Sequence, residues 1–169
     1  GPHQHVALHA GLLEGEHPNN AYAWLAKRSA GLEVRMVPHD KKWADAETFA
    51  HFIDGRTRAI GISHVMFHSG QRNDLESIIT LANRNGVKVV ADSMQSIGVL
   101  PIDVKQLHVS AFASGSHKGL LTPQGLGFMY TAEPLEALQP TYVANAGVAN
   151  ARADLVAGLD PIQLWPNAH

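Results

Sequence analysis

The chain has 169 residues, of which 45% are hydrophobic and 17% charged, a balance typical of a globular domain and not of a disordered segment. Its 13 basic and 15 acidic side chains give a formal net charge of −2, so electrostatics favour neither a nucleic acid nor an anionic membrane as a partner. Because cysteine is absent, this chain can form no disulfide or thiolate metal site, and we expect a cytoplasmic protein.

Helical and strand-like patterns alternate along the chain. The clearest helix is 73–86, in which Asn73 would be the N-cap, Glu76 follows three residues later and Gly86 lies past the end. In chain order, the predicted elements are strand 5–10, helix 20–31, strand 32–37, helix 44–55, strand 57–65, helix 73–86, strand 87–92, helix 103–108, strand 109–114 and strand 125–132. The loop before the last strand is too short for a helical crossover, so this strand should be antiparallel to its neighbour.

This alternation predicts an α/β fold with a mostly parallel sheet and helices on both faces. We assign residues 1–139 to one core domain. Residues 140–169 contain only weak patterns, and we interpret them as a tail that leads toward a further domain absent from this chain.

The 11 histidines raise the question of a metal site. His3 and His5 would lie on one face of a strand, because side chains alternate there. No carboxylates are spaced to complete a ligand shell, and no HExxH motif occurs, so we predict no functional metal site.

Polar residues follow the ends of several predicted strands. Asp92 ends one strand, and Lys118 follows the end of a later one. His17 and His64 also end or follow predicted strand regions. Because ligands of parallel sheets bind at the carboxyl ends of the strands, these residues indicate a site at that edge.

Lys118 lies in the segment SGSHKGLL, between the apolar runs VSAFA and GLLTPQGLGFMY, so its surroundings are predicted to be buried. Burial of a lysine lowers its pKa and prepares the amine to attack a carbonyl. The alternative is a surface lysine whose stem lies on apolar side chains while its ammonium stays in water.

Three segments resemble the class V aminotransferase family, enzymes of fold-type I that depend on pyridoxal 5'-phosphate (PLP). They are GEHPNN with the following Trp24, then ADSMQSIG, then SGSHKGLLTPQGLGFMY. The resemblance runs from about His5 to Ala132 and is greatest to the branch of cysteine desulfurases, selenocysteine lyases and isopenicillin N epimerase-like proteins. It implies that 1–139 is the PLP-binding large domain without its N-terminal part, and that 140–169 leads toward an absent small domain.

The resemblance also implies roles for single residues around the PLP ring. Lys118 would be the catalytic residue, forming the internal Schiff base and later moving the proton at the substrate α-carbon. Asp92 would pair with the pyridine nitrogen and keep it protonated, which makes the ring an electron sink. Gln95 would hydrogen-bond the phenolic oxygen, and His17 would stack on the ring face. On local sequence alone, Asp92 could instead cap a helix, since DSMQ resembles a capping box.

Two of the residues that precede Lys118 in the sequence are expected to hold the phosphate. His117 is one, and a serine is the other. The family has a serine or threonine three residues before the lysine, where this chain has Gly115, so Ser116 or Ser114 must serve. We assign Ser116 to the phosphate, with Ser114 as the alternative.

The function implied by the resemblance is a PLP-dependent enzyme that acts on an amino acid by transamination, C–S lyase or epimerase chemistry. Ser110 stands where the family usually has an acidic residue. Phe67 stands where desulfurases carry an asparagine, and this second difference favours a reaction other than sulfur removal from cysteine. The expected partners are a small amino-acid substrate and a second copy in a homodimer, with no nucleic acid or membrane. We expect the 169-residue chain alone to be inactive.

Two other interpretations belong to different classes. The chain could be a non-catalytic fragment or subunit that folds but needs another chain or further segments to bind PLP. It could also be an unrelated nucleotide-binding α/β domain. The second is disfavoured because no predicted strand is followed by GxGxxG or GxxxxGK[ST].

Overall fold

A computed structural model describes residues 7–38, 43–134 and 137–138 of the chain. Contacts divide the chain into two compact units, residues 1–132 and residues 133–169, and the first contains every helix and strand discussed here. The boundary predicted between residues 139 and 140, like the pair His3 and His5, lies outside the described residues.

The first unit is built on one six-stranded sheet with the order β2-β1-β3-β4-β5-β6. Neighbouring strands are parallel except for the last pair, in which β6 runs antiparallel to β5. The mostly parallel sheet and its antiparallel last strand are therefore confirmed. The strands are β1 (Leu8–Leu13), β2 (Leu32–Val37), β3 (Thr57–Ser63), β4 (Lys88–Asp92), β5 (Ala111–Gly115) and β6 (Gly127–Thr131).

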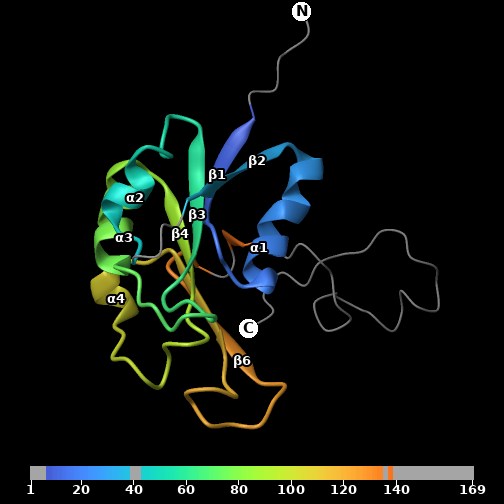
Figure 1. Ribbon diagram of the computed structural model, residues 1–169, viewed down its shortest axis with the longest axis vertical. Coiled ribbons are helices and arrows are strands. Elements are labelled where there is room, and N and C mark those ends of the chain that lie inside the picture. The colour runs from blue at the N-terminus through green and yellow to red at the C-terminus, as the bar shows by residue number, and fades with distance from the viewer. Residues whose placement is uncertain (1–6, 39–42, 135–136, 139–169) are drawn as a thin grey trace, which may run out of the picture. The chain divides into compact units, whose positions relative to one another are not determined.

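Helices cover both faces of the sheet, as predicted (Figure 1). α1 lies on one face, whereas α2, α3 and α4 lie on the other. The helices are α1 (Pro18–Leu25), the 3₁₀ helix η1 (Ala26–Ala30), α2 (Ala46–Ala50), α3 (Leu75–Arg84) and α4 (Val104–Leu107). Within the described residues, no helix is long and apolar enough to cross a membrane.

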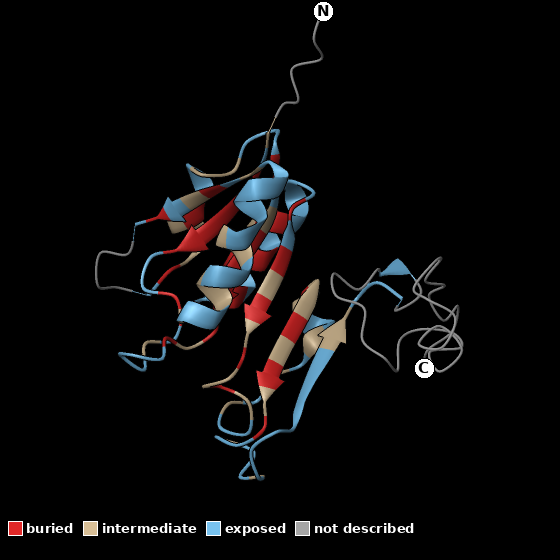
Figure 2. Cartoon of the chain, turned by 90° about the vertical axis from the view of Figure 1, so that its right-hand side faces the viewer, coloured by how far each residue is buried: buried red, intermediate tan, exposed pale blue. Residues whose placement is uncertain are grey.

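The hydrophobic core lies between the sheet and α3. Figure 2 shows the other side of the sheet, where the exposed helix α1 lies in front of largely buried strands. Ile78 and Ile79 of α3 pack in one cluster with Ile60 and Ile62 of β3, all of them essentially inaccessible to solvent. Each such side chain contributes about 1.5–3 kcal/mol of transfer free energy. The opposite face is covered more thinly, because α1 buries none of its residues.

Several predicted boundaries were wrong because contacts distant in sequence determine them. Strand β1 continues to Leu13, beyond the predicted end at residue 10, because the next apolar residues are buried in the core. Asn73 does not cap α3. It is fully buried, where it accepts a hydrogen bond from the Ala44 N–H and donates one to the Ser63 carbonyl. Asp74 is the cap instead, and its carboxylate accepts from the Ser77 N–H.

The first helix begins earlier than predicted, at Pro18, and its end is a separate 3₁₀ turn. Proline favours the first position of a helix because its missing N–H would have no partner there. The N-cap is His17, whose Nδ1 accepts from the Asn19 N–H at 3.2 Å. Helix formation therefore fixes the position of a residue that the sequence analysis assigns to the site.

Trp24 and Gly61 hold α1 against the sheet, and this contact predicts an effect on stability. A Cβ atom built on Gly61 would overlap the indole nitrogen of Trp24. We expect Gly61→Ala to lower the free energy of unfolding by about 1–3 kcal/mol, since overpacking forces the indole and α1 outward. Denaturant unfolding measures the change. Gly55→Ala is the control, because a Cβ there meets no atom within 4 Å. Equal stability of the two variants would contradict the prediction.

Candidate active site

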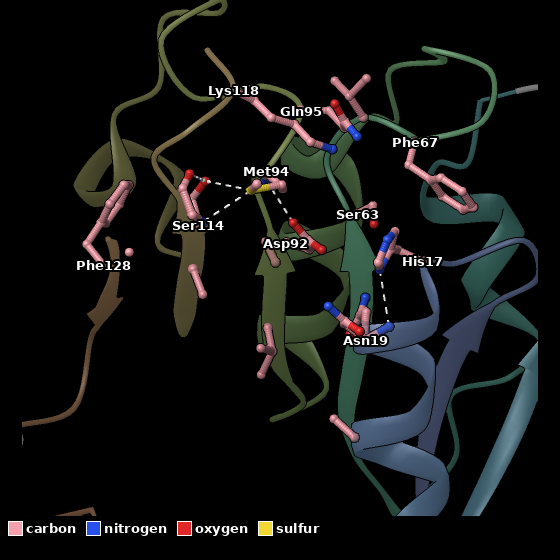
Figure 3. A pocket seen from close by; sticks show the side chains of 18 of the residues that line it. His17, Asn19, Ser63, Phe67, Asp92, Met94, Gln95, Ser114, Lys118 and Phe128 are labelled. Atoms are coloured by element: carbon pink, nitrogen blue, oxygen red, sulfur yellow. Dashed lines mark hydrogen bonds between the residues drawn. The ribbon is translucent and has the colours of Figure 1, made fainter. Parts of the chain in front are cut away.

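A cavity of about 810 Å³ opens at the carboxyl ends of β3, β4 and β5, beside the start of α1 (Figure 3). Parallel strands end at this edge of the sheet, which is where such folds bind ligands. The cavity is lined by polar residues from separate segments, among them His17, Asn20, Ser63, Asp92, Gln95, Ser114, His117 and Lys118. Five of the six predicted site residues therefore line one cavity, and Ser116 does not.

Lys118 lies in the loop between β5 and β6, and its side chain reaches over the cavity that Asp92 also lines (Figure 3). The prediction that its surroundings are buried is correct for the preceding run, in which Val109 and Phe112 are buried, and wrong for Lys118 and the loop after it. Lys118 is exposed, and so are most of the residues that follow, including Leu121 at 89% and Leu126 at 62%. The reason is that this loop joins the last two strands of the sheet, where β6 has a neighbour on one side only. The amine is therefore accessible to a ligand in the cavity.

Asp92 ends β4 and pairs in register with Ser63 of β3. Its Oδ1 accepts a hydrogen bond from the Met94 N–H at 2.8 Å, which orients the carboxylate. No helix starts at this point, since the residues after Asp92 form a run of turns, so the helix-cap alternative is excluded. In the described part of the chain, its other oxygen has no hydrogen-bond partner, so a ligand in the cavity could donate to it.

His17 presents its ring to the same cavity. Because Nδ1 accepts from the Asn19 N–H, the neutral ring carries its proton on Nε2. The Phe67 ring packs edge-on against it, with centroids 4.9 Å apart and an interplanar angle of 79°. Phe67 also lines the cavity and therefore helps to orient the imidazole.

The segment before Lys118 divides its two serines between different roles. Ser116 is buried, and its hydroxyl donates to the Leu126 carbonyl at 2.9 Å and accepts from the Thr122 hydroxyl. These bonds close the β5–β6 loop. Ser114 lines the cavity instead, and its hydroxyl donates to the Gly115 carbonyl at 2.7 Å.

Met94 is a cavity residue that the sequence analysis did not identify. Its sulfur accepts the Gly115 N–H at 3.2 Å, and a Cβ on Gly115 would lie 3.1 Å from both the sulfur and the terminal methyl. The thioether therefore fills the space beside a residue with no side chain. Gly115, at a position where the resemblance implies a serine or threonine, was the signal that could have indicated this compensation.

Two titratable residues near the cavity are perturbed by burial. Burial raises the pKa of Glu16, while hydrogen bonds from the Ser63 side chain and backbone and from Asn20 oppose the rise. Burial, with a smaller effect from Arg72, lowers the pKa of His64 to about 4. His64 does not line the cavity, although it follows β3. It lies instead beside a separate space of about 220 Å³ near α3 and α4.

The sequence of the chain is similar to those of known proteins. A profile of the family described as Aminotransferase class-V matches residues 9–156. An uncharacterised aminotransferase of Schizosaccharomyces pombe, C777.03c, is 44% identical over 155 residues, which cover 89% of this chain and 39% of that protein.

Solved structures agree with the fold as well. The cysteine desulfurase CsdA from Escherichia coli superimposes with a TM-score of 0.80 at 25% identity, covering 94% of this chain and 39% of its own. The cystine C–S lyase C-DES gives a TM-score of 0.75 at 29% identity, covering 86% of this chain and 40% of its own, and its structure holds the reaction product cysteine persulfide. A variant of C-DES carries glycine covalently linked to its PLP cofactor. The chain thus spans about 39–40% of the length of these three relatives.

Proposed function

Because the chain belongs to the class V aminotransferase family, whose members use PLP, we propose that it forms the PLP-binding core of an enzyme acting on an amino acid. The observation that carries this proposal is the convergence of an amine, a carboxylate and an imidazole on one cavity. Lys118, Asp92 and His17 come from three different segments, and all three line it.

The cavity residues fit the groups that PLP presents. The Lys118 amine would hold the aldehyde carbon, and Asp92 would accept a hydrogen bond from the pyridine nitrogen. Gln95 would donate to the phenolic oxygen, and the His17 ring would cover one face. His117 and Ser114 line the cavity and would donate to the phosphate, Ser114 by turning its hydroxyl away from the Gly115 carbonyl. We prefer Ser114 to Ser116 for this role because Ser116 does not line the cavity.

When bound, PLP withdraws electrons from the α-carbon of an attached amino acid. The residues of this chain would direct that chemistry. Lys118 would take the α-proton and return it, since its flexible stem reaches over the cavity. Asp92 would hold a proton on the pyridine nitrogen, and the ring of His17 would keep water from that face.

We propose transamination, C–S lyase or epimerase chemistry for the whole enzyme, which we expect to be a cytoplasmic homodimer. Phe67 favours a reaction other than sulfur removal from cysteine, because a phenyl ring cannot donate a hydrogen bond to a cofactor oxygen. Its contact with His17 gives it a role in positioning that ring.

The proposal is tested by adding PLP in excess to the 169-residue chain and to the longest form of the protein that carries it. Because a lysine–PLP adduct absorbs visible light, the expected result is a yellow protein whose colour borohydride removes while the mass of reduced PLP remains on the chain. An unchanged spectrum and no added mass in either form would contradict the proposal and would favour a non-catalytic role.

A further inference from the structure

Glu16 is a buried carboxylate at the edge of the candidate active site to which the proposed function gives no role. It is 8% exposed and precedes His17, in the turn that joins β1 to α1. A buried acidic side chain is rare unless it has hydrogen-bond partners or a task. Its contacts show which parts of the site depend on it.

The carboxylate joins the β1–α1 turn to the end of β3. Oε1 accepts from the Ser63 N–H at 2.7 Å, and Oε2 accepts from the Ser63 hydroxyl at 2.5 Å and from the Asn20 amide at 2.9 Å. The pairing of β1 with β3 stops at Leu12 and Gly61, so β1 offers no acceptor for the Ser63 N–H. Glu16 supplies that acceptor, and in doing so it holds the adjacent His17 beside the cavity.

Glu16 also adds negative charge next to Asp92. Ser63, which Glu16 binds twice, pairs in register with Asp92 on the neighbouring strand. The charge of Asp92 adds to the effect of burial in raising the pKa of Glu16, which means that the two carboxylates repel each other. A cation bound against Asp92 would relieve this repulsion. The two carboxylates together therefore favour a positive charge next to Asp92.

We propose that Glu16 is a positioning residue of the cofactor site, which fixes His17 through Ser63 and Asn20 and supports a protonated pyridine nitrogen at Asp92. This inference rests on the proposed function. The competing interpretation is purely structural, with Glu16 serving only to satisfy the Ser63 N–H. The two interpretations differ in one respect, because only the positioning role requires Glu16 to be negatively charged.

Glu16→Gln separates them, since glutamine keeps the shape and an oxygen acceptor but carries no charge. The measurement is the pH midpoint of the absorption change of PLP bound to the protein, which is the pH at which half of the bound cofactor has lost its proton. Of the titratable groups near Glu16, Asp92 faces it from β4, His17 follows it in sequence, and Lys118 lines the cavity together with these two residues. All three remain in the variant.

We expect Glu16→Gln to lower the midpoint by about half a pH unit, because removing a nearby negative charge destabilises the protonated form of the bound PLP. Glu14→Gln is the matched control, since Glu14 is exposed two residues away, and its midpoint should equal that of the wild type. An unchanged midpoint in Glu16→Gln would overturn the inference and leave the proposed function intact. No PLP on the wild type would overturn both.

Ser63→Ala provides a second test that keeps the Glu16 side chain, should Glu16→Gln fail to fold. It removes the hydroxyl that donates to Oε2, so Glu16 is ionised less readily and the midpoint should again fall. A midpoint equal to that of the wild type would count against the inference.

The unfolding free energy without PLP gives an independent readout. A carboxyl whose folded pKa is raised binds its proton more tightly when folded, so its contribution to stability is lost as the pH rises above the ordinary pKa of about 4.5. Glu16→Gln should remove this loss, whereas Glu14→Gln should retain it. Parallel pH profiles for the wild type and Glu16→Gln would show that no buried charge forms, which would overturn the inference.

Discussion

Lys118→Ala should lose all borohydride-stable attachment of PLP, while the wild-type chain should carry the label on the peptide that contains Lys118. We expect the label on Lys118 because its side chain lines the cavity. An alanine offers no amine to the aldehyde, so turnover of any amino acid should also fall, by roughly 10³-fold or more for loss of a covalent partner and proton carrier together. Peptide mapping by mass spectrometry locates the label.

Lys105→Ala is the control for this experiment. Lys105 lies on α4, is exposed, and does not line the cavity, so labelling of that variant should match the wild type. Labelling of Lys88 or Lys105 in the wild type, or full labelling of Lys118→Ala, would contradict the assignment of the reactive amine.

Asp92→Asn should leave the fold nearly unchanged but slow the exchange of the substrate α-proton by roughly 10²–10³-fold, the loss typical of removing one electrostatic partner. The asparagine oxygen can still accept from the Met94 N–H, so the turn after β4 should survive. The amide cannot hold a proton on the pyridine nitrogen as a carboxylate does, so the ring would withdraw electrons less strongly. Loss of deuterium or protium at the α-carbon, followed by NMR in the longest form of the protein, measures this step.

Asp103→Asn is the matched control for Asp92→Asn. Asp103 caps α4 at a distance from the cavity lining, and asparagine is an equally good N-cap residue. Its exchange rate should therefore equal that of the wild type. A rate in Asp92→Asn equal to that of the control would show that the carboxylate does not serve the ring nitrogen.

Local patterns predicted the architecture well because they report which side chains must be buried. Period-two and helical spacing identified alternating strands and helices, and a loop without room for a helix indicated that β6 runs antiparallel. The same reasoning brought most of the site together. Carboxyl ends of parallel strands share one edge of a sheet, so the sequence alone predicts that Asp92 and Lys118 meet there.

The sequence by itself therefore determined the fold class, the edge of the sheet where the cavity lies, and three residues that line it, His17, Asp92 and Lys118. Tertiary structure alone decided the details that depend on distant partners. Asn73 is a core residue and not a cap, because Ala44, 29 residues away, requires its side chain as an acceptor. Glu16 joins Ser63 over a separation of 47 residues, a contact that no local pattern encodes.

The environment of Lys118 was decided in the same way. Apolar flanking residues indicate burial only if another element covers them, and among the described residues no strand lies on the outer side of β6. Likewise, Ser114 and Ser116 are two residues apart, yet one lines the cavity and the other closes a loop, because Leu126 and Thr122 lie next to only one of them. Such choices depend on which chain segments the fold brings into contact, and a linear sequence does not specify that by periodicity or motif.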